Sequence, residues 1–146
     1  MINYILDRYY YKSRSSICIE ATLCCIALPF LVTLLGAMIG KYPPDRQYFT
    51  TIFLAPWVET LFIFLPIIEI LRTRSLGIKS WVIVLITAIV FGLIPPHFLV
   101  PFIGGIFLAC VYIILRRFSL SQAFFYTSLV HLCANLILVS FYTILP

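Results

Sequence analysis

Charged side chains are scarce in this sequence. They make up 10% of its 146 residues, and only five residues are acidic, whereas about 25% of the residues in ordinary soluble domains are charged. Hydrophobic residues make up 63% of the chain. Because so few polar side chains cannot cover the surface of a soluble domain, the composition excludes that class and predicts an integral membrane protein.

The sequence also lacks paired cysteines and a basic cluster. Its five cysteines include no C-x-x-C pair and all lie in apolar runs, which argues against a metal cage or a disulfide framework. We interpret them as small apolar side chains. The ten Lys and Arg residues are scattered between apolar runs instead of gathering on one face. We therefore expect membrane lipids around the chain and no nucleic-acid partner.

Long apolar runs, by contrast, fill the chain. Five of them alternate with short stretches rich in Pro, Arg, Lys or Ser, at residues 16–40, 49–71, 81–100, 102–115 and 121–145. Since a bilayer-crossing helix needs about 20 apolar residues, we predict an all-α, polytopic transmembrane bundle of about five spans. It forms a single domain over residues 1–146. The fourth run is short, and its helix is expected to be buried or to begin inside the break at 96–101.

Basic residues near the ends of the spans predict the orientation. Eight of the ten precede the first span, join the second to the third, or join the fourth to the fifth. Only Lys41 and Arg46 fall on the opposite side. Because Lys and Arg near span ends prefer the cytoplasm, the N-terminus is predicted to be cytoplasmic and the C-terminus to lie outside.

Polar side chains inside the spans are few, and each is costly. An acidic or basic group at the middle of a bilayer costs roughly 2.5 to 3.5 kcal/mol on insertion scales. The candidates are Glu20, Glu59, Glu69, His97, His131 and Asn135. Glu69 is three residues before Arg72, so it can pair within its own helix or reach headgroups. Glu20 lies one turn into the first span and can reach the interface, so we expect a structural role for both.

Four of these residues are too deep for that explanation. Glu59 lies near the middle of the second span, and its short side chain reaches neither surface. His131 and Asn135 are four residues apart, which stacks both on one face of the fifth span. His97 ends a Pro-Pro-His turn, where the helix must break and the imidazole is expected to face a protein-lined cavity. We predict that these four residues share one polar site.

Such a site has two chemical uses. A carboxylate and an imidazole that hold a water can act as general base toward an amide carbonyl, while a second imidazole and an amide donate to the oxyanion. Alternatively, Glu59, His97 and His131 provide three ligands for zinc and leave one position for water. The composition does not separate these two mechanisms.

Three sequence motifs resemble those of the CAAX-protease and bacteriocin-processing (CPBP, or ABI) intramembrane proteases. The family pattern is E-E-x-x-x-R, then F-x-x-x-H, then H-x-x-x-N or D, on three helices. The segment from Ala55-Pro56 through Glu59 to Phe64 is similar to the first motif, and Phe91 to His97 is similar to the second. The third, from Ser128 to His131 and Asn135, is the most specific. The likeness covers about residues 52–138.

The resemblance implies that Glu59 with His97 activates a water, while His131 and Asn135 stabilise the oxyanion. It implies a peptide or protein substrate, a bacterial cytoplasmic membrane as the location, and no required cofactor if the glutamate acts directly. The sequence departs from the pattern at Thr60 and Phe64, where the family has its second Glu and its Arg. Two extra residues also separate Phe91 from His97.

Two interpretations from different classes follow. The first is an intramembrane endopeptidase that acts on a membrane-associated or secreted peptide. The second is a catalytically inactive relative, a bacteriocin-immunity or partner-binding membrane protein in which the same four residues only hold the bundle together. Losing the Glu and the Arg together fits either one, because it leaves no single uncompensated charge in the membrane.

Overall fold

The computed structural model describes residues 16 and 20 and the ranges 50–73, 78–95 and 98–144. Apart from those two positions, the predicted first span at 16–40 lies outside the described residues. Within the described ranges the chain forms helices and short connections and contains no strand. The predicted all-α class is therefore confirmed for this part of the chain.

The first described helix runs without interruption through four segments. It begins as a π-helix, η1 (Thr50–Leu54), continues as α3 (Ala55–Glu59), widens again to η2 (Thr60–Phe64) and ends as α4 (Leu65–Thr73). Pro56 lies in the first turn of α3, directly after η1, and because it has no N–H it leaves a carbonyl of the preceding turn without its helical donor. We refer to the whole element as helix 50–73.

The π-helical segments decide which face of helix 50–73 meets the bundle. Its buried residues recur at every fourth position: Ile52, Pro56, Thr60, Phe64 and Ile68. Four residues overshoot an α-helical turn of 3.6 residues by about 40°, so this stripe drifts around a pure α-helix. A π-turn closes one residue later than an α-turn. Alternating the two kinds of turn therefore keeps the stripe on one side.

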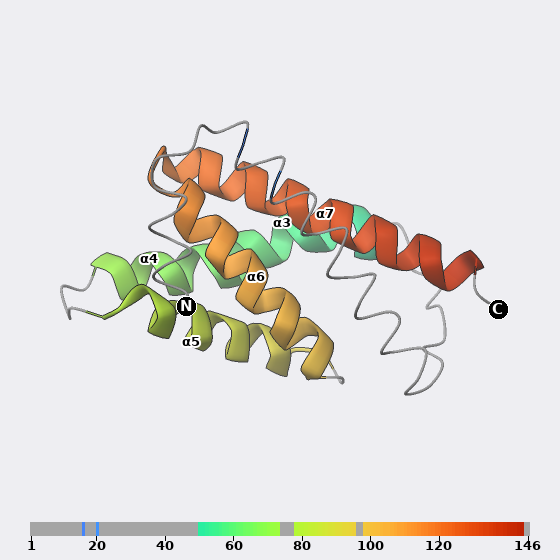
Figure 1. Cartoon of the computed structure of the whole chain (residues 1–146), viewed down its shortest axis with the longest axis horizontal. Helices are drawn as coiled ribbons and strands as arrows, with labels where there is room; N and C mark the ends of the chain where they lie inside the picture. Colours follow the sequence, from blue (N-terminus) through green and yellow to red (C-terminus); the bar gives the residue numbers. More distant parts are fainter. Residues whose placement is uncertain (1–15, 17–19, 21–49, 74–77, 96–97, 145–146) are drawn as a thin grey trace.

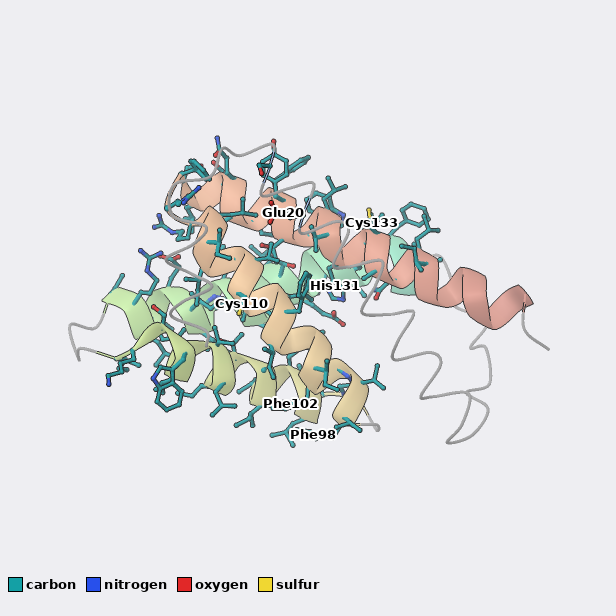
Figure 2. The ribbon with its side chains drawn as sticks, in the orientation of Figure 1. Glu20, Phe98, Phe102, Cys110, His131 and Cys133 are labelled. Carbon is teal, nitrogen blue, oxygen red and sulfur yellow. The ribbon has the colours of Figure 1, made fainter. Side chains whose placement is uncertain are left out.

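Two shorter helices follow, and their limits differ from the predicted spans. Helix α5 (Ser80–Leu93) ends before residue 100, and α6 (Leu99–Leu115) begins inside the proline-rich break. Ile94 still has helical dihedral angles as the C-cap of α5, and the helix ends at the Pro95-Pro96 pair, where the second proline disfavours a helical conformation at the first. Pro101 lies in the first turn of α6, where backbone N–H groups have no partner within the helix. Phe98 stacks on Phe102 at the start of α6, as Figure 2 shows.

Helix α6 packs between α5 and the long helix α7 (Leu120–Ile144), while helix 50–73 runs beside α7 (Figure 1). The approach of α5 to α6 depends on Gly105, since a Cβ there would lie 3.0 Å from the Cα of Ala88. Tyr112 and Phe64 are the largest of the fully buried side chains. Helix 50–73 and α7 contact each other along η1, α3 and η2.

Two of the described helices are long and apolar enough to cross a membrane, judged by length and composition. They cover Ile52–Thr73 and Leu120–Ile137, whereas α5 and α6 are apolar but only 14 and 17 residues long. Large apolar side chains also point outward: Phe62 is 70% exposed and Leu93 is 69% exposed. A surface of this kind is typical of a protein that contacts lipid or a partner.

Candidate active site

Glu59 and His131 face each other across the interface between helix 50–73 and α7. Glu59 is the last residue of α3, and its Oε2 lies 3.5 Å from Nε2 of His131. This distance exceeds that of an ordinary N–H···O hydrogen bond. The His131 side chain is 8% exposed and that of Glu59 is 30% exposed. The carboxylate therefore stands at the edge of the site and the imidazole lies inside it.

Aromatic side chains hold the imidazole in place. The ring of Phe91 from α5 meets His131 edge-on, with centroids 5.7 Å apart and planes at 80°, and Phe91 in turn packs on Phe64 at 5.0 Å. Figure 2 shows His131 on the side of α7 that faces the bundle, whereas Cys133 lies on the other side. Three elements thus converge on one ring.

Trp57 fixes the carboxylate end of the site. Its ring lies 5.7 Å from Phe124 and 5.6 Å from Phe125, both on α7. Aromatic pairs of this kind contribute about 0.5 to 1.5 kcal/mol beyond the area they bury. Because Trp57 is two residues before Glu59, these contacts set the position of the carboxylate along α7.

The other two predicted site residues have different outcomes. Asn135 is half-buried and lies one turn beyond His131 on the same face of α7. His97 lies outside the described residues, so its meeting with Glu59 stays a prediction. Among the described residues no group of three or more His, Cys, Asp or Glu side chains gathers around one point. Of the three residues that the sequence suggested as zinc ligands, Glu59 and His131 lie close together.

The positions of the two departures from the family pattern face the interior. Thr60 and Phe64 are both completely buried. A hydroxyl and a phenyl ring therefore occupy places inside the bundle where the resemblance leads us to expect a carboxylate and a guanidinium.

Sequence reasoning missed three hydroxyl groups at the same interface. Thr60, Thr127 and Ser128 are completely buried, and their side-chain oxygens have no hydrogen-bond partner. Thr127 and Ser128 precede His131 by four and three residues, a spacing that puts all three on one face of α7. This spacing was the signal in the sequence that could have identified Thr127 and Ser128 as neighbours of His131.

Glu69 has a partner that the sequence did not predict. The Nε and Nη2 of Arg116 donate to its two carboxylate oxygens at 2.7 and 3.1 Å, and the Tyr112 hydroxyl donates at 3.4 Å. The expected pairing with Arg72 is therefore replaced by one between helices. The hydrogen bonding with Glu69 raises the pKa of Arg116 above its ordinary value. Glu69 has a structural role at the far end of helix 50–73.

Glu20 also has a local partner, since the hydroxyl of Ser16 donates to its Oε1 at 3.4 Å.

Comparison of the chain with known proteins finds no matching family model, no matching curated protein and no matching solved structure.

Proposed function

We propose that this chain is an intramembrane endopeptidase of the CAAX-protease and bacteriocin-processing type, acting on a membrane-associated or secreted peptide. The observation that supports it is the approach of Glu59 to His131, from two helices, at 3.5 Å in a largely buried setting. A carboxylate at this depth is costly unless it has a use or a partner. The sequence motifs supply the reaction type.

In this proposal Glu59, together with His97, accepts a proton from a water as the water oxygen attacks the scissile carbonyl. His131 and Asn135 donate hydrogen bonds to the oxyanion that forms. The proton then passes to the leaving amine as the C–N bond breaks. If the enzyme uses zinc, Glu59, His97 and His131 hold the ion, which supplies a Lewis acid to the same water.

The proposal includes a location and an orientation. The apolar helices lie in a cytoplasmic membrane, the N-terminus is on the cytoplasmic side, and the C-terminus is outside. The distribution of the basic residues supports this orientation. The substrate then reaches Glu59 from the lipid or from the interface.

An inactive relative that confers immunity or binds a partner is the second candidate. Thr60 and Phe64 support it, because both are completely buried where the family pattern has a carboxylate and a guanidinium. In that case the contact between Glu59 and His131 is only structural.

The test is proteolysis by the purified protein in liposomes, with a library of internally quenched peptides that carry an apolar segment. We expect cleavage by the wild type, and a loss of about 10² to 10⁴ in Glu59→Gln and His131→Ala, the range that general acid–base groups contribute. Chelation by 1,10-phenanthroline separates the two mechanisms, since only a zinc enzyme loses activity.

Ser121→Ala is the control, because Ser121 is an exposed residue at the start of α7. Thermal melting of all variants accompanies the assay. If the wild type cleaves no peptide and both site variants melt well below the control, the inactive relative replaces the peptidase.

A further inference from the structure

Four buried polar atoms at the site lack any hydrogen-bond partner. They are Thr60 Oγ1, Thr127 Oγ1, Ser128 Oγ and His131 Nδ1, and all are sealed from solvent. Thr60 comes from helix 50–73 and the other three residues come from one face of α7, which packs against it. The orphaned atoms are therefore concentrated at the interface that carries Glu59.

Buried helical hydroxyls ordinarily avoid this cost by donating to a carbonyl of their own helix. Thr87, which is also completely buried, does so, with its Oγ1 donating to the Ile83 carbonyl at 2.8 Å. The Thr60 hydroxyl makes no such bond to the carbonyls of Pro56 and Trp57, which accept its backbone N–H. Each orphaned buried group costs about 1 to 3 kcal/mol. Four of them at one interface call for a ligand.

We propose that this interface is a hydration site in which Thr60, Thr127, Ser128 and His131 bind a small cluster of water that enters past Glu59. Water matches the set because hydroxyls both donate and accept hydrogen bonds. The three hydroxyls carry no charge to attract an ion. The inference rests on the proposed function in one respect, since this water would supply the nucleophile for hydrolysis.

The geometry identifies the entrance. The sealed atoms admit water only when neighbouring side chains shift, and Glu59 approaches the ring of His131 at 3.5 Å, which is longer than an ordinary hydrogen bond. Glu59 is also the more exposed of the pair. Thr60 begins the π-helical segment η2, and segments of this kind occur frequently at functional sites.

The first test is the direction in which melting temperature changes when a hydroxyl is replaced by a methyl group of the same shape. In a hydrated site, Thr127→Val and Thr60→Val remove bonds to water and lower the melting temperature. In a dry interface the same variants remove an orphaned polar group and raise it. Thr87→Val is the matched control, because its hydroxyl is satisfied within its own helix and reports the cost of losing that bond alone.

The second test is thiol accessibility in a variant whose five native cysteines are replaced by alanine. Ser128→Cys is expected to react with a methanethiosulfonate ethylammonium probe at least about tenfold faster than Ala123→Cys, because the reactive thiolate forms where water reaches the thiol. Ala123 is completely buried on the same helix and lies in the apolar core, so it gives the rate for a dry position.

A rise in melting temperature for both valine variants overturns the proposal, and so does a Ser128→Cys rate equal to that of Ala123→Cys. Neither measurement depends on proteolysis. If the interface is hydrated but the protein cleaves no peptide, this inference stands and the proposed function fails. If the protein cleaves peptides but the interface is dry, the proposed function stands and this inference fails.

Discussion

At the scale of single residues, depth in the apolar runs identified two side chains that meet, whereas sequence spacing was a poor guide to pairing. Glu59 and His131 were singled out because neither reaches a surface, and they do meet. For Glu69 the sequence offered Arg72 or lipid headgroups as partners, but its carboxylate pairs with Arg116, which is 47 residues away. Helical spacing identifies neighbours within one helix only, so a contact between helices is invisible to it.

The ion pair of Glu69 and Arg116 is expected to stabilise the bundle. Both side chains are mostly buried, at 18% and 27% exposed, and hydrogen bonds to charged groups contribute roughly 1.5 to 3 kcal/mol. Glu69→Gln and Arg116→Gln should each lower the melting temperature, and the double variant should be less destabilised than the sum of the two. A double-mutant cycle in detergent measures this coupling.

Arg117 provides the control for that cycle. Its guanidinium lies over the ring of Phe118, 4.5 Å from the centroid, and it belongs to the same basic turn. Combining Arg117→Gln with Glu69→Gln should give additive effects. Equal coupling of Glu69 to both arginines would mean that a diffuse charge effect, and not the observed hydrogen bonds, stabilises this end of the bundle.

At the scale of elements, the sequence predicted the helices, but it did not predict all of their first and last residues or which segments are π-helical. Apolar runs gave the positions of the described helices, yet the run at 81–100 contains both the end of α5 and the start of α6. The Pro95-Pro96 pair was the signal for that break. The π-helical segments were not predicted, although the four-residue repeat from Ile52 to Ile68 was present in the sequence. A four-residue repeat does not by itself indicate π-helical turns, because the residues of the buried face must be known first.

Adjacent glycines in α6 are expected to respond to alanine in opposite directions. A Cβ at Gly104 meets nothing within 4 Å, so Gly104→Ala should stabilise the protein by up to about 1 kcal/mol through helix propensity. A Cβ at Gly105 would lie 3.0 Å from backbone of Ala88, and overpacking of this kind costs about 1 to 3 kcal/mol. Thermal melting of the two variants checks the prediction.

The comparison is sharp because both substitutions add the same methyl group to neighbouring positions of one helix. Helix propensity cancels between them, so the difference measures the contact of α6 with α5. If Gly105→Ala melts at or above Gly104→Ala, the close approach of these two helices is wrong.

At the scale of the whole molecule, the candidate site depends on an arrangement that the sequence could not specify. The motifs identified residues on three helices, but only the packing of helix 50–73 against α7 brings Glu59 to His131 and adds Thr60, Thr127 and Ser128 beside them. Period and spacing give the face of a helix, whereas the partner of that face follows from the tertiary packing. The aromatic contacts of Trp57 with Phe124 and Phe125 on α7 likewise follow from the tertiary packing and not from the spacing.

The packing also bears on orientation. The ion pair of Glu69 with Arg116 joins the end of helix 50–73 to the end of α6. The end of helix 50–73, the start of α5 and the end of α6 therefore lie at one end of the bundle, and the end of α5 and the start of α6 lie at the other. The four basic residues within the described ranges, Arg72, Lys79, Arg116 and Arg117, all occur at or beside the first end. The positive-inside rule then predicts that this end is cytoplasmic.

Cysteine labelling tests this topology without removing any charge. In the cysteine-free background, Thr73→Cys and Ser121→Cys place exposed thiols at the predicted cytoplasmic end, and Ile94→Cys, at a site 58% exposed, places one at the other. A membrane-impermeant maleimide added to intact cells should label Ile94→Cys alone, and all three should react after permeabilisation. Labelling of all three in intact cells would contradict the membrane topology, and the reverse pattern would invert it. Both results bear on the proposed water entrance beside Glu59, which lies in the Ile52–Thr73 segment. In the reverse pattern this segment crosses the membrane in the opposite direction, and if all three thiols are labelled it does not cross the membrane.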